Sequence, residues 1–492
     1  MDQYYKKWSK VLVAPAVILF ICIVAIPFII GVVYSFTSWR GTYFAGGSLT
    51  ESFVGLDNYI KTFTNEKFRD SFFYTCIFTV LSVVTVNVCA MLLALLVTNI
   101  MKGSGIFRTI IFMPNMLGGL ALGFIWQFIF QVVFTDILFG KEGFLHIEAL
   151  RYMTQDPVKA LFALLLMTTQ STGLWRCSGA GSNLLYRNGD YIIYPGKRHT
   201  EKGGGDVMQQ LSENYTLINR IKKAGIYIVL ILISLLVLLP LVFLLLNSFK
   251  SQAEIIRNPL SLPGHVTFKY IKNAFETIHF GRALGYTLVL EVFSLIGIVL
   301  FSTLCAWMIT RCKSKAMNVI YLLFVAAMLV PFQAIMYPLI SIMESLSLKN
   351  LLGLIIMYTG FGISMSVFMM TGYIKGIPRD IEESALIDGA NIFQIFFRIL
   401  LPLVKPMIIT IVILNGMWIW NDYLLPFLTL GNSDFKTITL EIYYAKMTSG
   451  QFGSPWETLF PAVLIAILPL VVLFLLFQKH FVKGVTSGAV KS

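Results

Sequence analysis

Polar residues inside long apolar runs are the side chains of this chain that could do chemistry. Gln333, Asn421 and Asp422 interrupt runs that are otherwise aliphatic and aromatic, and Glu291 does so in an earlier run. A charged side chain at the centre of a bilayer costs on the order of 3 kcal/mol, so such residues normally face a bundle interior or a water-filled cavity. We interpret Gln333, Asn421 and Asp422 as candidates for a translocation path. A hydrogen bond between helices is the alternative for Gln333 and the preferred interpretation for Glu291.

No catalytic arrangement accompanies these residues. The sequence has no GxxxxGK[ST] phosphate loop, and the glycines near Gly179 and Gly203 lack the lysine and the strand-to-helix setting of such a loop. No Ser/His/Asp pattern stands out among the five His, and the six Cys show neither CxxC nor Cys/His spacing. We therefore predict no enzyme activity, no ATP hydrolysis by this chain, no metal site and no disulfide framework.

A polar island at residues 376–406 separates two of the apolar runs and reads GIPRDIEESALIDGANIFQIFFRILLPLVKP. Pro378 supplies a pre-set φ at a first helical position, and the acidic residues that follow it place negative charge where the helix dipole favours it. Ile381, Ala385 and Leu386 then share one face. The pattern predicts a short helix whose apolar strip suits a groove on a partner.

The second part of this island predicts another helix. Gly389 allows a sharp turn out of the first helix. An amphipathic stretch rich in Phe begins at Asn391 and is broken by Pro402 and Pro406 where the next apolar run begins. We therefore expect a helix, a turn and a second helix lying at a membrane face.

Composition sets the class of protein. Hydrophobic residues make up 57% of the 492 residues, charged residues 13%, and the mean hydropathy is +0.77, values that exclude an ordinary soluble globule. The net charge of +13 comes from short basic clusters at the ends of apolar runs, which is the positive-inside pattern. We read this charge as membrane topology, and predict no nucleic-acid partner.

The apolar runs predict an all-α, polytopic helical bundle of about nine or ten spans, each of roughly 20 residues. Residues 158–175 are a marginal tenth segment, because their second half is polar. The basic clusters place the N-terminus, the C-terminus and the island at 376–406 on the cytoplasmic side. The expected spans are 11–34, 72–97, 109–133, 224–247, 284–309, 317–340, 351–374, 407–430 and 461–481.

The island resembles the EAA loop of ABC importer permeases. The spacing of that motif, EAA, three residues, Gly, nine residues and Ile-x-Leu-Pro, is met throughout, with serine replacing the first alanine. The sequences DGA and WNDYLLPF, the latter at 420–427, resemble those of the carbohydrate branch of these permeases, the maltose and multiple-sugar type. The residues that the resemblance assigns to ATPase coupling are Glu383, Ser384, Ala385, Asp388, Gly389, Ile399, Leu401 and Pro402.

The resemblance implies the function and the partners. It implies a membrane subunit of a binding-protein-dependent sugar importer in a bacterial inner membrane. The implied partners are an ABC ATPase dimer that binds the ATP, a partner permease subunit, an extracytoplasmic sugar-binding protein, the sugar or oligosaccharide, and membrane lipid. The chain itself would hold no cofactor. Trp418, Trp420 and Tyr423 could stack on sugar rings, but we interpret them as interface anchors.

The resemblance also divides the chain. Residues 1–175, with FVGLDNYIKTF and FRTIIFMPNM, resemble a first-type permease that is cut short before its own EAA loop. Residues 176–207 read as an irregular connector, and residues 208–492 resemble a complete six-span second-type permease. Two alternatives stay open: a non-functional fusion of two tandem permease genes, and an ion-coupled secondary transporter, which would need coupling carboxylates in broken spans.

Overall fold

A computed structural model describes most of the chain as helix. The residues it describes are 2–41, 43–45, 47–98, 106–107, 110–111, 113, 118–139, 151–169, 205–312, 314–431, 433–447 and 454–489. Within these ranges no strand is formed beyond two isolated bridges, which pair Thr37 with Phe53 and Trp39 with Phe44. The all-α expectation is confirmed. Most of the connector predicted at 176–207 lies outside the described residues.

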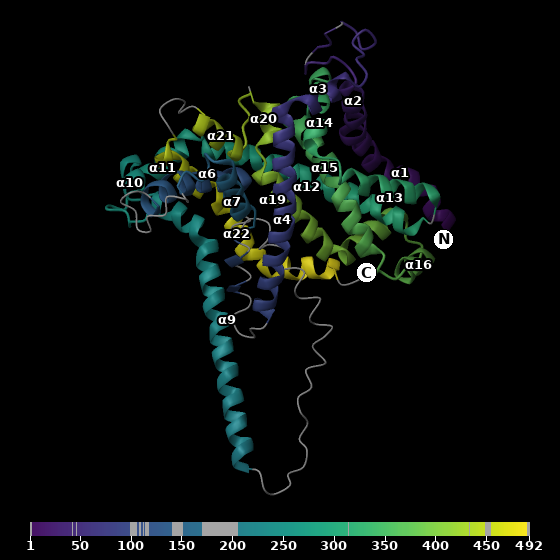
Figure 1. Cartoon of the computed structure of the whole chain (residues 1–492). Helices are drawn as coiled ribbons and strands as arrows, with labels where there is room; N and C mark the ends of the chain where they lie inside the picture. The colour runs from purple at the N-terminus through teal and green to yellow at the C-terminus, as the bar shows by residue number, and fades with distance from the viewer. Residues whose placement is uncertain are drawn as a thin grey trace. The chain divides into compact units, whose positions relative to one another are not determined.

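The helices follow one another along the described parts of the chain (Figure 1), with η marking π-helical stretches. Those of the first half are α1 (Asp2–Phe20), η1 (Ile21–Ala25), α2 (Ile26–Ser35), α3 (Asp57–Thr64), α4 (Glu66–Thr98), α6 (Gly119–Phe128), η3 (Ile129–Leu138), α7 (Pro157–Thr168), α9 (Gly205–Asn247), α10 (Gln252–Arg257) and α11 (Lys269–Thr277). The remainder are α12 (Phe280–Arg311), α13 (Lys315–Ala327), α14 (Phe332–Ser345), α15 (Leu351–Ile374), α16 (Asp380–Ile387), α17 (Ile392–Gln394), η7 (Ile395–Leu400), α18 (Leu401–Leu403), α19 (Lys405–Asn421), α20 (Leu424–Leu430), α21 (Ile438–Met447) and α22 (Trp456–Ala489).

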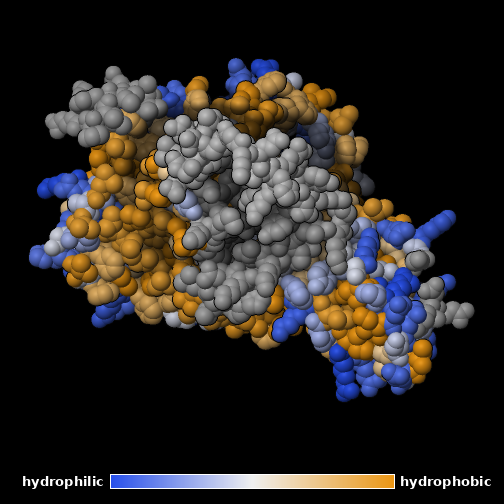
Figure 2. All heavy atoms as spheres, turned by 90° about the horizontal axis from the view of Figure 1, so that it is seen from below, coloured by the Kyte–Doolittle hydropathy of each residue, from blue (hydrophilic) through white to orange (hydrophobic). Residues whose placement is uncertain are grey.

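Membrane-length helices dominate the described part of the chain. Seven are long and apolar enough to span a bilayer, and the number rises to nine if each of two bent helix pairs counts as one span. Figure 2 shows the matching surface, on which wide apolar areas are interrupted by small hydrophilic groups. The segment at Pro157–Thr168 is apolar but shorter than a span, in keeping with the polar residues that follow it. The polytopic membrane class is confirmed.

One of the two bent pairs divides a span that the sequence predicts as continuous. The expected span at 317–340 is divided into α13 and α14, which meet at 104°, because Pro331 stands at the N-cap of α14. The second bent pair joins the helical stretch Ile392–Leu403 to α19 at 75°, where the sequence places the break at Pro402 and Pro406. The expected span at 407–430 is interrupted beyond this bend, because α19 ends at Asn421 and α20 begins at Leu424.

The chain forms two compact units. The first contains residues 1–75, 271–462 and 479–492, and the second contains 76–270 and 463–478. In the first unit α12 packs along α15, and small side chains allow a close approach. A Cβ added to Gly297 would lie 2.9 Å from Thr359, and one added to Gly362 would lie 2.4 Å from Ile298. Helix pairs in membranes commonly pack through such small residues.

The N-terminal helix belongs to this first unit. Helix α1 packs against α12 and α15, and its buried residues Val13, Ala16 and Phe20 join the same apolar core. Near its start the ring of Trp8 meets that of Phe393 edge to face, with centroids 5.6 Å apart. Helices from distant parts of the sequence therefore share one core, and the chain begins beside α16 (Figure 1).

The second unit contains α9, which begins well before the span predicted at 224–247. A small core joins α4 and α9 through Leu93, Val97, Leu230 and Val237. After α9 the ammonium of Lys250 is buried and donates to three oxygens, Oδ1 of Asn247 and the carbonyls of residues 258 and 259, at 3.0 to 3.2 Å. Burial lowers the pKa of Lys250. These bonds hold the turn that follows the helix.

Candidate functional site

The island at 376–406 forms the helix, turn and helix expected of it. Helix α16 begins at Asp380, two residues after Pro378, and ends in a Schellman arrangement. The amide of Gly389 donates to the carbonyl of Leu386 at 3.1 Å, and the amide of Ala390 donates to the carbonyl of Ala385 at 2.9 Å. Gly389 has φ of +84°, a conformation that costs other residues about 1–2 kcal/mol. The glycine fixes the exit from α16.

The second helix begins with a capping box. Asn391 accepts a hydrogen bond from the amide of Gln394, whose side chain accepts one from the amide of Asn391, so two otherwise unpaired amides are satisfied. Helices α17, η7 and α18 then continue as one piece up to Leu403. Ile395 and Phe396 of this piece are buried in the core, which fixes the island to the membrane bundle.

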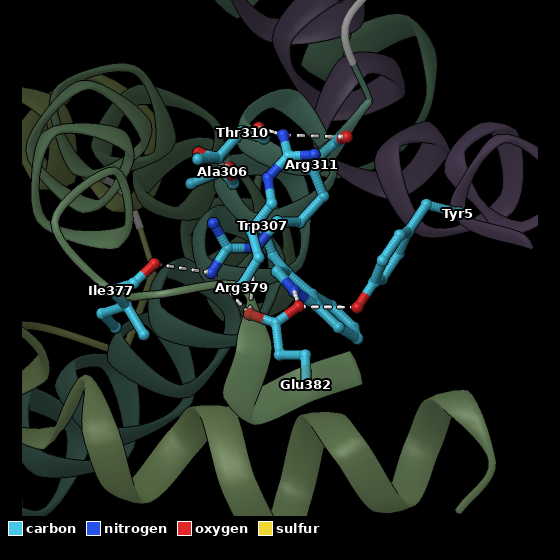
Figure 3. Close-up of polar contacts among 8 residues, drawn as sticks. All are labelled: Tyr5, Ala306, Trp307, Thr310, Arg311, Ile377, Arg379 and Glu382. Atoms are coloured by element: carbon cyan, nitrogen blue, oxygen red, sulfur yellow. Dashed lines mark hydrogen bonds and ion pairs between the residues drawn. The ribbon is translucent and has the colours of Figure 1, made fainter. Parts of the chain in front are cut away.

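Glu382 is the buried centre of this island (Figure 3). Its side chain is 1% exposed and its carboxylate accepts four hydrogen bonds. Oε1 accepts from Nε and Nη2 of Arg311 at 2.9 and 2.5 Å, whereas Oε2 accepts from the hydroxyl of Tyr5 at 2.7 Å and from the indole of Trp307 at 2.9 Å. A buried carboxylate is tolerated only with such pairing.

Two arginines bind the island to the end of α12. Arg311 is 2% exposed and its Nη2 also donates to the carbonyl of Ile377 at 3.2 Å. Arg379 donates from Nη2 to the carbonyls of Thr310 and Arg311 at 3.1 and 3.4 Å. The last carbonyls of a helix lack intrahelical partners, so Arg379 supplies a donor to two of the last carbonyls of α12. Since Tyr5 lies in α1, the carboxylate of Glu382 joins α16 to α1 as well as to α12.

The residues that the motif assigns to coupling are more exposed than Glu382. Glu383 and Ala385 are half-buried, and Asp388, Gly389 and Pro402 are exposed. The hydroxyl of Ser384, the residue that departs from the motif, donates to the carbonyl of Asp380 at 2.8 Å, so the extra polar group is satisfied within its own helix. Ile399 and Leu401 are half-buried.

The apolar strip expected on α16 is divided between two faces. Ala385 and Leu386 pack against the core, whereas Ile381 is 42% exposed and Ile387 is 84% exposed. The exposed surface of α16 is therefore made by Ile381, Ile387 and Asp380, with Glu383 half-buried, because the helix uses its other face to bind the bundle.

A cavity of about 480 Å³ lies where the helix breaks come together. Its lining includes residues from the break between α13 and α14 and residues around Asp422, where α19 gives way to α20. Interrupted helices line the substrate sites of many transporters, because irregular backbone is tolerated within a membrane only beside protein or water. The polar side chains that line the cavity are Gln333, Ser364, Asn415 and Asp422, and the aromatic ones are Phe332, Phe361 and Trp418.

The three candidate path residues have different surroundings. Gln333 and Asp422 line the cavity. Asp422 accepts a hydrogen bond from the hydroxyl of Tyr358 at 2.9 Å and another from the amide of Leu424 at 2.9 Å. Asn421 is not among the residues that line it, and its amide donates to the carbonyl of Met417 at 2.9 Å. Its role in a path stays a prediction.

Three residues of the candidate site have surroundings that sequence patterns do not predict. Arg311 ends an apolar run and its position indicates topology, yet it is the buried partner of Glu382. Trp418 has the position of an interface anchor, whereas its ring lies at the cavity and meets the ring of Tyr358 edge to face at 5.3 Å. Asn415 is buried and donates to the hydroxyl of Ser366 at 3.2 Å. Only the polar character of Asn415 within an apolar run could have signalled it.

A membrane bundle with interrupted spans, a central cavity and an amphipathic helical island at one face defines a transport permease. Residues 298–487 match the family described as "Binding-protein-dependent transport system inner membrane component". The chain is 40% identical over 261 residues to the probable starch degradation products transport system permease protein AmyC of Thermoanaerobacterium thermosulfurigenes, covering 53% of this chain and 94% of that protein.

Two further similarities have the same extent. The multiple sugar-binding transport system permease protein MsmG of Streptococcus mutans is 34% identical, covering 54% of this chain and 96% of that protein. A crystal structure of a bacterial ABC transporter involved in alginate import contains a chain with 22% identity and a TM-score of 0.46, covering 54% of this chain and 97% of that chain. The chain belongs to the family of binding-protein-dependent transport system inner membrane components. This is a family of inner-membrane permeases rather than of enzymes.

Proposed function

We propose that this chain moves a carbohydrate across the membrane as the permease subunit of an ATP-driven importer. The observation that carries the proposal is the cavity between the broken helices, where Gln333, Asp422 and Asn415 offer hydrogen bonds beside the exposed ring of Trp418. Sugars present hydroxyl groups around apolar ring faces, so polar groups beside an aromatic ring suit them. Of the relatives named above, AmyC has the transport of starch degradation products in its name, and MsmG has a multiple sugar-binding transport system.

Coupling to ATP would pass through α16. We propose that a separate ATPase dimer docks on its exposed face, with Glu383 as the polar contact and Gly389 holding the turn. Glu382 would then pass the displacement of α16 to α12 through Arg311. Since α12 packs on α15, and α15 contributes Phe361 and Ser364 to the cavity lining, this route joins the docking surface to the cavity.

The remaining assignments belong to the same proposal. An extracytoplasmic sugar-binding protein would deliver the sugar, and a partner permease subunit would complete the pathway. Both chain termini and α16 would lie on the cytoplasmic side. We retain the division into a truncated unit at 1–175, a connector at 176–207 and a complete permease at 208–492, since AmyC accounts for only 53% of this chain.

The substrate class can be tested by uptake. The full chain, an ATPase subunit, a binding protein and a partner permease from the same source are reconstituted in vesicles with ATP on the ATPase side. Labelled oligosaccharides and labelled amino acids are supplied on the opposite side. Accumulation of an oligosaccharide but of no amino acid is expected. Accumulation of an amino acid, with every oligosaccharide excluded, would refute the carbohydrate proposal.

A further inference from the structure

A second cavity, separate from the first, lies at the end of the bundle that carries α16. Its volume is about 650 Å³. It opens where the span formed by α12 ends at Arg311 and where the span formed by α15 ends at Ile374, so its height corresponds to the edge of the bilayer. Its polar lining consists of Thr310, Arg311, Ser314, Lys315, Asn318, Lys375 and Arg379.

The lining carries a large excess of positive charge. Four of its side chains are Lys or Arg, and no acidic residue occurs among the described residues that line it. Arg311 is paired with Glu382, and Arg379 donates to the last carbonyls of α12, so an anion in the cavity would be bound chiefly by Lys315 and Lys375. Lys315 and Lys375 are both exposed, and the ammonium of Lys375 stands 5.4 Å from the ring centre of Tyr321. Like charges gathered in this way favour a bound anion.

Helix α13 shows which kind of anion fits. Lys315 and Asn318 lie in its first turns and line the cavity. Residues of the following turns on the same side, at i+4, i+7 and i+8 from Lys315, are apolar and open: Val319 is 55% exposed, Leu322 is 62% exposed and Leu323 is 51% exposed. A basic polar pocket therefore continues directly into an apolar track along the helix. A ligand that matches both is an anionic amphiphile.

We propose that this cavity binds the phosphate headgroup of an anionic phospholipid, with the acyl chains lying along the apolar side of α13. Basic pockets between membrane helices near the bilayer surface bind such headgroups. A free phosphate ion shares the headgroup chemistry, but it would use only the basic pocket and leave the apolar track uncovered. The lipid headgroup would lie beside Arg379 and Arg311, whose hydrogen bonds hold the island at 376–406 to α12. Its binding would therefore stabilise the contact between the island and α12.

The test is a titration of the purified full chain with lipid, followed by native mass spectrometry. Phosphatidylglycerol is compared with phosphatidylcholine, and the apparent affinity is measured for the native chain and for K315Q/K375Q. Each lysine contributes a factor of roughly five near an anionic surface, so the double variant is expected to bind phosphatidylglycerol about thirtyfold more weakly. The single variant K315Q should lose about fivefold.

A lysine at the other end of α15 supplies the matched control. Lys349 precedes that helix and pairs with Glu344 at 3.5 Å, so K349Q should bind phosphatidylglycerol as the native chain does. Equal affinity of the native chain and K315Q/K375Q would overturn the proposal. Full displacement of the lipid by millimolar inorganic phosphate would also overturn it, since the site would then belong to a free anion rather than to a lipid.

Discussion

Replacing Glu382 by Gln removes the charge at the centre of the island and changes little in shape. The substitution leaves the guanidinium of Arg311 buried, at 2% exposure, without its counter-ion. The hydrogen bonds from Tyr5 and Trp307 can still reach the amide oxygen. The amide NH2 of Gln would face the N–H donors of Arg311, so the effect of the substitution reports on the loss of the ion pair together with its two hydrogen bonds.

The expected loss is large because both partners are buried. Breaking a buried ion pair by removing one partner costs about 3–5 kcal/mol, since the remaining charge is left uncompensated. The neighbouring carboxylate of Glu383 is half-buried and is not the partner of Arg311, so E383Q should change the free energy of unfolding by no more than about 0.5 kcal/mol. We therefore expect a large loss of stability from E382Q and almost none from E383Q.

The assay is unfolding of the purified chain in detergent, combined with uptake by the assembled transporter. E382Q should lower both stability and uptake, whereas E383Q should lower uptake alone. The double variant R311M/E382Q removes the unpaired charge, so its loss should be smaller than the sum of the single losses by up to about 3 kcal/mol. Equal stability of E382Q and E383Q, or additive losses in the double variant, would refute the role given to the pair.

Three further predictions concern the turn, the first helix and the cavity. G389V should abolish uptake while leaving membrane insertion intact, because valine cannot adopt φ of +84° without strain; G389N, which tolerates that conformation, should retain uptake, and equal uptake by the two variants would contradict this. Y5F removes one donor to a buried carboxylate and should cost about 1.5–3 kcal/mol in unfolding measurements, whereas a change within error would dismiss the contact. W418A opens the cavity and should raise the sugar concentration needed for half-maximal uptake without altering ATP hydrolysis in the absence of sugar; an unchanged concentration dependence would exclude the ring from the path.

Sequence patterns predict the local features of this protein well. The motif spacing locates the island, and the turn at Gly389 follows from residue type alone, because few residues other than glycine adopt positive φ. The positions of the long helices follow from apolar length. The break between α13 and α14 has a local signal too, in Pro331, but the angle of 104° does not follow from it.

Tertiary contacts decide what the patterns leave open. Arg311 and Lys375 both stand at the ends of apolar runs, yet one is buried against Glu382 and the other stays accessible. The pairing joins residues 71 positions apart, and the contact of Tyr5 with Glu382 joins residues 377 positions apart. Contacts between residues so far apart in the sequence have no local sequence signal. A single sequence therefore could not distinguish Glu382 from Glu383 as the buried residue.

The central claim is that ATP hydrolysis by a docked ATPase drives carbohydrate through this chain. The most direct measurement follows oligosaccharide uptake and ATP hydrolysis together in the same vesicles, with the ATPase subunit present or omitted. The account predicts that the binding protein with its sugar raises both rates together, and that uptake stops when the ATPase is omitted. Uptake that continues without the ATPase and responds to an ion gradient would contradict it and favour an ion-coupled transporter.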